Sequence, residues 1–339
     1  MNGELMAAEI AEQPEVLHRL VERGGEIADR VRGLLPQPLA GITLLARGSS
    51  DHAAIYGRYI MEMAAGRPAG LAAPSIHTLY RARVDLSGYL AVGISQSGET
   101  PEIVTALGRL GAEGASTIAI VNSAGSPLSA AATATIVLGA GEERAVPATK
   151  TVTATLLALA LVARGLGDVP WKDPELDLLP ERVSALLADQ DPAEKVATVL
   201  DGADRLIVTG RGMLLAAALE TALKLRETSG ILAEGISPAD LRHGPIAAIG
   251  EGFPVLEFAA EAVEPDAPDL VALLRERGAR VLTVGPSSGA VCPLPRGLAP
   301  ALLPILAVVR GQQLAAAVAR FRHLDPDSPA GLTKVTSTR

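Results

Sequence analysis

A strand–turn–helix unit that occurs twice is the feature that most limits the fold of this chain. The first copy is LLARG at 44–48 and the second is IVTGRG at 207–212. Apolar runs and turn residues then predict two series of alternating strands and helices. The first series has strands at 41–45, 90–94, 116–121 and 135–138 and helices at 48–64, 101–110, 126–131 and 150–164. The second has strands at 205–209, 253–258, 280–284 and 303–308 and a helix at 214–229. Such alternation is typical of α/β domains with parallel sheets covered on both faces.

Breaks in this alternation divide the 339 residues into five parts, with enough chain for two domains. A helical segment with an interruption near Pro14 comes first, and a stretch rich in Gly and Pro separates the two α/β series. The predicted parts are a helical segment at 1–34, a first α/β domain at 35–168, a linker helix at 169–192, a second α/β domain at 193–323 and a tail at 324–339.

Composition argues against several classes of protein. Aromatic residues are 2% and the net charge is −8, so neither a base-stacking surface nor a basic nucleic-acid face is expected. Cys292 is the one cysteine, expected to be a semi-buried thiol, and no acid, His and Cys set has ligand spacing. Apolar runs at 156–163 and 298–309 are too short or broken by proline to span a bilayer. No signal-peptide pattern opens the chain. The sequence predicts a cytoplasmic protein without metal, cofactor, nucleic-acid partner or membrane contact.

The segment GISQSGET at 93–100 joins a predicted buried strand to a predicted helix that starts at Pro101. Hydroxyl groups, an amide and the free N–H groups of the helix start then gather at the carboxyl end of a strand. This combination binds a phosphate group without any Lys or Arg. The alternative is a serine-rich turn with an ordinary helix cap.

The predicted helix 214–229 combines an apolar surface with a charged stripe. Ala and Leu occupy nearly every side, so the helix should be buried. Glu220, Lys224 and Glu227 nevertheless fall on one stripe at spacings of four and three. Buried charges are costly, which favours a catalytic carboxylate with a supporting ammonium group. The alternative is an exposed ladder of ion pairs.

Two further segments carry candidate residues. Gly244-Pro245 would place His243 on a loop, although a lone histidine is more often structural. Lys334 lies in a tail whose composition predicts a frayed end, where a lysine is normally a solvated charge.

Together these segments resemble the tandem sugar-isomerase (SIS) proteins, a family that includes the isomerase half of glucosamine-6-phosphate synthase. The matching segments occur in order along almost the whole chain: EIAEQP at 9–14, ARGSSDHAA at 46–54, GISQSGETPE at 93–102, ERAVPATK at 143–150, GRGMLLAAALETALKLRETSG at 210–230, LRHGP at 241–245 and GLTKVT at 331–336. The resemblance implies two flavodoxin-like three-layer αβα sandwiches.

The resemblance also implies roles for individual residues. Glu227 would move a proton between the first and second carbons of a sugar, and Lys224 would support the enol-like intermediate. His243, supplied by the partner subunit of a homodimer, would assist ring opening. Lys334 would engage the open-chain sugar, as an imine with the ketose in the synthases. Val146 would line the pocket. Sugar contacts would come from Gly48, Ser49 and Ser50, and phosphate contacts from Ser95, Gln96, Ser97 and Thr100.

Three departures or gaps limit this comparison. Arg47 stands where the family usually has a small residue, and Thr149 and Lys150 match without an assignable step. The synthases carry a glutaminase domain with a leading cysteine, whereas this chain begins Met1-Asn2, so glutamine is not expected to supply nitrogen to this polypeptide acting alone. The favoured expectation is conversion of glucosamine-6-phosphate to fructose-6-phosphate and ammonia. The alternatives are a fructosamine-6-phosphate deglycase, an aldose–ketose phosphosugar isomerase and a non-catalytic sugar-phosphate sensor.

Overall fold

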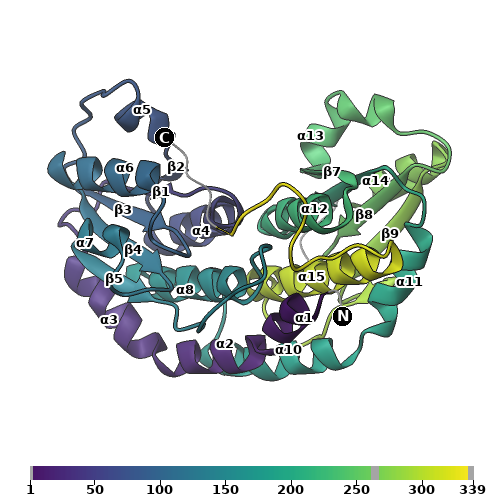
Figure 1. The fold of residues 1–339 in the computed structure, drawn as a ribbon. Helices are drawn as coiled ribbons and strands as arrows, with labels where there is room; N and C mark the ends of the chain where they lie inside the picture. Colours follow the sequence, from purple (N-terminus) through teal and green to yellow (C-terminus); the bar gives the residue numbers. More distant parts are fainter. Residues whose placement is uncertain (1–2, 261–266, 335–339) are drawn as a thin grey trace. The chain divides into compact units, whose positions relative to one another are not determined.

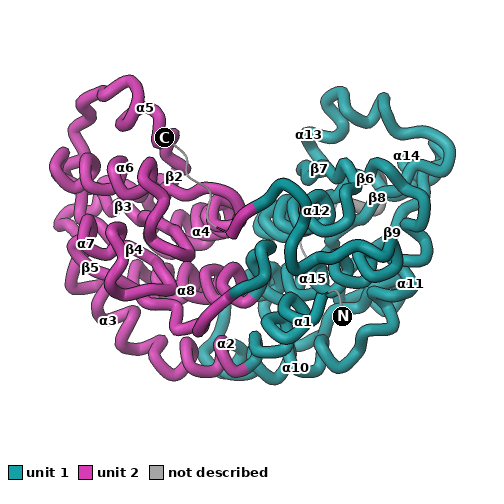
Figure 2. The backbone as a smooth tube through the Cα atoms, in the orientation of Figure 1, with its two compact units in different colours: residues 1–14, 144–149, 171–332 teal, residues 15–143, 150–170, 333–339 magenta. Residues whose placement is uncertain are grey.

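The computed structural model describes residues 3–260 and 267–334 (Figure 1). The chain forms two compact units (Figure 2). Unit 1 consists of residues 1–14, 144–149 and 171–332, and unit 2 of residues 15–143, 150–170 and 333–339. The units therefore interleave in sequence, whereas the boundaries predicted from the sequence follow one another along the chain.

Unit 2 contains a parallel sheet with the strand order β2-β1-β3-β4-β5. Its strands are β1 (Gly41–Leu45), β2 (Ala69–Leu71), β3 (Tyr89–Ile94), β4 (Ser116–Val121) and β5 (Ala134–Val137). Its helices are α2 (Gln13–Glu22), most of which belongs to this unit, α3 (Gly24–Leu34), α4 (Ser49–Ala65), α5 (Pro74–Thr78), α6 (Pro101–Ala112), α7 (Pro127–Ala130) and α8 (Lys150–Leu166). Apolar side chains of α6, such as Ile103 and Leu107, pack with Leu45 and Ala119 of the sheet. Helix α4 packs against β1 and against α8, which also packs against α3.

Unit 1 contains a second parallel sheet with the order β10-β9-β8-β6-β7. Its strands are β6 (Arg205–Gly210), β7 (Leu232–Ile236), β8 (Pro254–Phe258), β9 (Arg280–Gly285) and β10 (Cys292–Pro293). Its helices are α1 (Glu4–Ala11), α9 (Asp173–Asp177), α10 (Leu179–Ala188), α11 (Asp191–Val199), α12 (Leu214–Ser229), α13 (Pro238–Arg242), α14 (Ala267–Glu276) and α15 (Leu303–Phe321), with 3₁₀ turns at Pro245–Ala248 and Pro300–Leu302. Leu241 of α13 and Leu274 of α14 pack with Ile207 and Val255 of the sheet. Helix α12 packs against β6, β7 and α15.

The predicted fold class is confirmed. Each sheet, numbered from its own first strand, has the order 2-1-3-4-5 of flavodoxin-like domains, and helices cover both faces. The strand–turn–helix unit found twice in the sequence therefore begins two copies of one topology. Strands β2, β7 and β10 were absent from the prediction because they are short or carry few apolar residues.

The predicted strand at 303–308 is wrong, because this segment is the start of α15. An apolar run of this length fits a buried strand and a buried helix equally well. Pro304 lies in the first turn of α15, where a missing N–H group costs nothing, so the helix continues through Arg310 to Phe321.

The described residues contain one helical stretch, Pro300–Phe321, that is long and apolar enough to cross a membrane. Its apolar window is 100% buried inside the protein, as in the core helix of a soluble protein. Cys292 of β10 is also fully buried rather than semi-buried, and its Sγ lies 3.2 Å from the Pro192 carbonyl oxygen.

Candidate active site

The two loops predicted to bind a sugar phosphate lie side by side at the carboxyl edge of the first sheet. Gly48 follows β1 and leads into Ser49 and Ser50, the first residues of α4, and the loop from Ser95 to Thr100 follows β3. Strands β1 and β3 are hydrogen-bonded neighbours whose ends are paired through Leu45 and Gly93. In a sheet of this order, β1 and β3 flank the switch point where ligands bind. The structure thus brings these two groups of residues together within unit 2.

Hydrogen bonds among its own residues fix the conformation of the loop from Ser95 to Thr100. The hydroxyl oxygens of Ser95 and Thr100 lie 3.2 Å apart, and Ser95 Oγ accepts a hydrogen bond of 3.2 Å from the Gly98 N–H. Thr100 is the N-cap residue of α6, yet among the described residues its side chain makes no cap hydrogen bond. The loop is therefore more than an ordinary serine-capped turn. Ser95 is buried, and Gln96, Ser97 and Thr100 are partly exposed.

Gly98 fits this loop because of its backbone conformation and its neighbour. Its φ is +67°, a region that L side chains rarely adopt, and an added Cβ would lie 2.1 Å from Ser126 Oγ. The Gly98 carbonyl accepts a hydrogen bond of 2.9 Å from the Leu128 N–H. The loop is thus fixed against the segment that contains Ser126 and Leu128.

Arg47 is attached to the start of α6. Its guanidinium makes two hydrogen bonds of 2.9 Å to the carboxylate of Glu102, in the first turn of that helix. This pair joins the segment after β1 to the first turn of α6, which accounts for a large residue at this position. Burial raises the pKa of the neighbouring Asp51 carboxyl, and the charges of His52 and Arg47 oppose this rise.

The charged stripe of α12 is a buried ion cluster. Lys224 and Glu220 are each 1% exposed, and the side chain of Glu227 is 21% exposed. Lys224 Nζ lies 2.5 Å from Glu227 Oε2 and 3.5 Å from Glu220 Oε1. The exposed ladder considered for this helix is therefore wrong. The cluster presents one partly accessible carboxylate that is oriented by a buried ammonium group, an arrangement suited to proton transfer.

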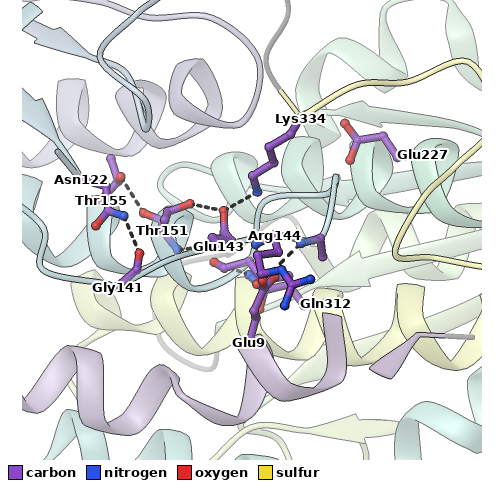
Figure 3. Close-up of polar contacts among 12 residues, drawn as sticks. Glu9, Asn122, Gly141, Glu143, Arg144, Thr151, Thr155, Glu227, Gln312 and Lys334 are labelled. Carbon is purple, nitrogen blue, oxygen red and sulfur yellow. Dashed lines mark hydrogen bonds and ion pairs between the residues drawn. The ribbon is translucent and has the colours of Figure 1, made fainter. Parts of the chain in front are cut away.

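Three other predicted residues lie in separate places. His243 is exposed at the C-cap of α13, and its backbone N–H donates a hydrogen bond of 3.0 Å to the Asp240 carbonyl oxygen. Val146 is partly exposed in unit 1, and its N–H donates to the Asp327 carbonyl oxygen over 2.9 Å. Lys334 belongs to unit 2, and its Nζ lies 2.8 Å from Glu143 Oε2 (Figure 3). The predicted tail lysine is thus engaged by a carboxylate rather than solvated. The residues from Val335 to Arg339 lie outside the described residues.

Two buried carboxylates were not singled out from the sequence. Glu143 holds Lys334, and Glu9 of α1 accepts hydrogen bonds from the N–H groups of Arg144 and Ala145 (Figure 3). Both belong to segments that match the family, EIAEQP and ERAVPATK, which was the available signal. Glu9 fixes the segment that carries Val146.

The predicted residues thus fall into groups on separate units. The two segments predicted to bind a sugar phosphate and Lys334 belong to unit 2, while Val146, Lys224, Glu227 and His243 belong to unit 1. In residues 3–260 and 267–334, no three His, Cys, Asp or Glu side chains gather as metal ligands would.

The model of the SIS domain matches residues 40–164 and 200–289, one match in each sheet region. The glutamine–fructose-6-phosphate aminotransferase of Methanothermobacter thermautotrophicus is 33% identical over 343 residues, which cover 97% of this chain and 56% of that protein. The chain therefore spans a little over half the length of this curated relative.

Solved structures show the same fold. A candidate phosphosugar isomerase from Silicibacter pomeroyi is 32% identical, with a TM-score of 0.84 over 96% of this chain and 100% of that chain. The glucosamine-6-phosphate deaminase of Thermotoga maritima has a TM-score of 0.81 over 99% of this chain and 100% of that chain, and at 23% identity it supports the fold alone. With a family match in both sheet regions and a full-length relative above 30% identity, this chain belongs to the SIS-domain family.

Proposed function

We propose that this protein is a phosphosugar isomerase that converts an amino-sugar 6-phosphate, glucosamine-6-phosphate in the first instance, to fructose-6-phosphate and ammonia. The observation that carries the proposal is the buried cluster of α12, in which Lys224 Nζ lies 2.5 Å from Glu227 Oε2. A sugar-phosphate sensor needs a phosphate loop but has no use for a costly buried carboxylate–ammonium pair.

The proposed reaction assigns one task to each group. The loop from Ser95 to Thr100 binds the phosphate with hydroxyls and N–H groups, and Ser49 and Ser50 bind the sugar. His243 of the partner subunit of a homodimer transfers a proton during ring opening. Glu227 then removes the proton on the second carbon and returns it to the first, which leaves a C=N bond at the second carbon. Water adds to this imine, and breaking the C–N bond gives the ketone of fructose-6-phosphate and ammonia. Lys224 stabilises the negative charge of the enol-like intermediate.

The names of the relatives support this class of substrate. The aminotransferase relative acts on fructose-6-phosphate, and the relative of known structure at 32% identity is named for phosphosugar isomerisation. A proton transfer between neighbouring carbons is common to deamination, deglycation and simple isomerisation, so the substrate decides among these three.

The test separates chemistry from phosphate binding. Glu227→Gln should reduce turnover of glucosamine-6-phosphate by at least about a thousandfold, in line with loss of a general base. Inorganic phosphate binding, measured by calorimetry, should stay within about twofold of the wild type. Glu276→Gln, at an exposed carboxylate of α14, is the matched control and should retain full activity.

The substrate is identified by measuring ammonia and ketose separately. Glucosamine-6-phosphate, galactosamine-6-phosphate, a fructosamine-6-phosphate and fructose-6-phosphate should be compared at equal concentration. Ammonia and ketose from glucosamine-6-phosphate support the proposal. Full activity of Glu227→Gln contradicts the assignment of the base, and a wild-type protein that binds these sugars without converting any of them is a sensor.

A further inference from the structure

Glu143 lies in the segment before α8, and its buried carboxylate contacts the first turn of that helix. The proposed mechanism does not use this carboxylate. Its side chain is fully buried, with an exposed fraction of 0%. Glu143 Oε1 accepts a hydrogen bond of 3.1 Å from the Thr151 N–H, and Oε2 accepts one of 2.7 Å from Thr151 Oγ1. The first N–H groups of a helix lack partners within the helix and favour negative charge, so this position stabilises a carboxylate.

The same carboxylate holds the tail lysine. Lys334 Nζ lies 2.8 Å from Glu143 Oε2, and the Lys334 side chain is 23% exposed (Figure 3). Thr151 and Lys334 therefore share the oxygens of one buried group. Its place is fixed by the backbone of α8, whereas Lys334 lies in a coil segment beyond the last helix. The rigid partner in this pair is Glu143, and the tail is positioned by it.

We propose that Glu143 is the positioning residue of Lys334: it holds the tail in place and takes the ammonium proton when Lys334 attacks the open-chain ketose. This inference rests on the proposed function for its chemical part. The ammonium transfers one proton to the Glu143 carboxylate, and the neutral amine adds to the ketose carbonyl carbon. Loss of water from the adduct forms the C=N bond, and Glu143 returns its proton to the water that leaves. The sum is an ammonium and a ketone giving a protonated imine and water.

If Glu143 only capped α8, the substitution Glu143→Gln would have a different effect on the tail. In Glu143→Gln, the amide oxygen can still accept from the Thr151 N–H. The amide nitrogen can donate to Thr151 Oγ1, since a hydroxyl both donates and accepts. Only Lys334 then faces a donor instead of an acceptor. The substitution therefore preserves the cap and removes the contact to the tail.

Tail position is measured without any substrate, by limited proteolysis. Trypsin cleaves after Lys334 only when the side chain leaves Glu143 and enters the protease, so the initial rate reports the open fraction. Release of residues 335–339, followed by intact mass, should be about tenfold faster in Glu143→Gln than in the wild type, which corresponds to about 1.4 kcal/mol. Glu142→Gln changes the exposed neighbouring carboxylate and should cleave at the wild-type rate. Lys334→Arg keeps both the ion pair and a trypsin site, and should be cleaved as slowly as the wild type.

The proton-accepting role is measured by trapping the imine with borohydride in the presence of fructose-6-phosphate. Wild type and Glu142→Gln should yield a reduced adduct on Lys334 at pH 7, and Lys334→Arg should yield none. Glu143→Gln should be trapped at least about tenfold more slowly at pH 7 and should recover as pH is raised to 9. If Glu143 only capped α8, Glu143→Gln and the wild type would have the same trapping rate and the same pH profile.

The outcomes separate this inference from the proposed function. Equal cleavage rates for Glu143→Gln and wild type overturn the positioning role, and equal trapping profiles overturn the proton transfer. Rapid cleavage of Glu143→Gln together with no wild-type adduct supports the positioning role and overturns the imine step. Ammonia release from glucosamine-6-phosphate, measured as above, tests the proposed function separately.

Discussion

Replacement of Lys224 by methionine should lower the free energy of unfolding by about 3–5 kcal/mol, the usual cost of removing one partner from a buried ion pair. Methionine keeps the unbranched stem and the helix propensity, so the main change is loss of the ammonium group. Glu220, 1% exposed, and Glu227, 21% exposed, would then lie two turns apart on one face of α12 without the positive charge between them. In an exposed ladder each pair contributes only about 0.3–0.5 kcal/mol, so the two interpretations differ severalfold.

The loss of unfolding free energy is measured by urea unfolding monitored by circular dichroism. Lys224→Met combined with Glu220→Gln should recover part of the loss, because the second change removes one of the two negative charges. Lys195→Met, at an exposed position of α11, is the control and should change stability by less than about 0.5 kcal/mol. A loss below about 1 kcal/mol for Lys224→Met would refute the buried cluster, and equal stability of single and double variants would refute the coupling to Glu220.

Three further outcomes follow from the geometry. Gly98→Ala should cost about 2 kcal/mol or more in urea unfolding and weaken inorganic phosphate binding, because its φ is positive and a Cβ would overlap Ser126; wild-type affinity would contradict the loop assignment. Arg47→Ala should lower stability by no more than about 1 kcal/mol, measured in the same way, because the Arg47 side chain is 44% exposed and solvent screens its pair with Glu102. Burial raises the pKa of Cys292 from 9.0 to about 11, so its contribution to stability is fully present below pH 9 and is lost as pH rises toward 11. The loss should reach about 2 kcal/mol relative to Cys292→Ala, measured by unfolding at each pH, and a constant difference would contradict it.

The interior strands and the positions of the segments that follow β1 and β3 could be predicted because local patterns determine them. Strands such as β3 and β4 are continuous apolar runs bounded by turns, and the loop from Ser95 to Thr100 follows from the carboxyl end of β3. Edge strands could not be found in this way. Strand β10 has two residues, and Leu232 of β7 is 74% exposed, so neither shows the apolar run of a buried strand.

Side chains fixed by distant partners were also beyond local patterns. The carboxylate of Glu143 is placed by Thr151, eight positions away, and by Lys334, 191 positions away. From the sequence alone, Glu143 cannot be distinguished from the other charged residues of its polar segment. By contrast, the stripe of α12 was predictable because its members lie within two turns of one helix whose remaining surface is apolar.

The two sheets share one strand order but carry different groups at the elements that follow their first strands. In unit 2, β1 leads to Gly48, Ser49 and Ser50, whose hydroxyl and N–H groups suit contacts to a sugar. In unit 1, β6 leads to α12, where charged side chains occupy a buried helix face.

The support of α12 explains why a helix face suits a proton-transfer group. An added Cβ at Gly311 of α15 would lie 2.0 Å from Thr221 Oγ1, so the two helices approach closely because a glycine lies at this point. Thr228 Oγ1 lies 2.8 Å from the Lys224 carbonyl oxygen and 3.3 Å from that of Ala315, which joins the same pair of helices. Proton transfer requires a base held to within a fraction of an ångström, and a packed helix meets this requirement better than a loop. Under the proposed function, the first crossover therefore differs between the two copies: one would carry the serine hydroxyls that contact the sugar, and the other would carry the base Glu227 on a rigid helix.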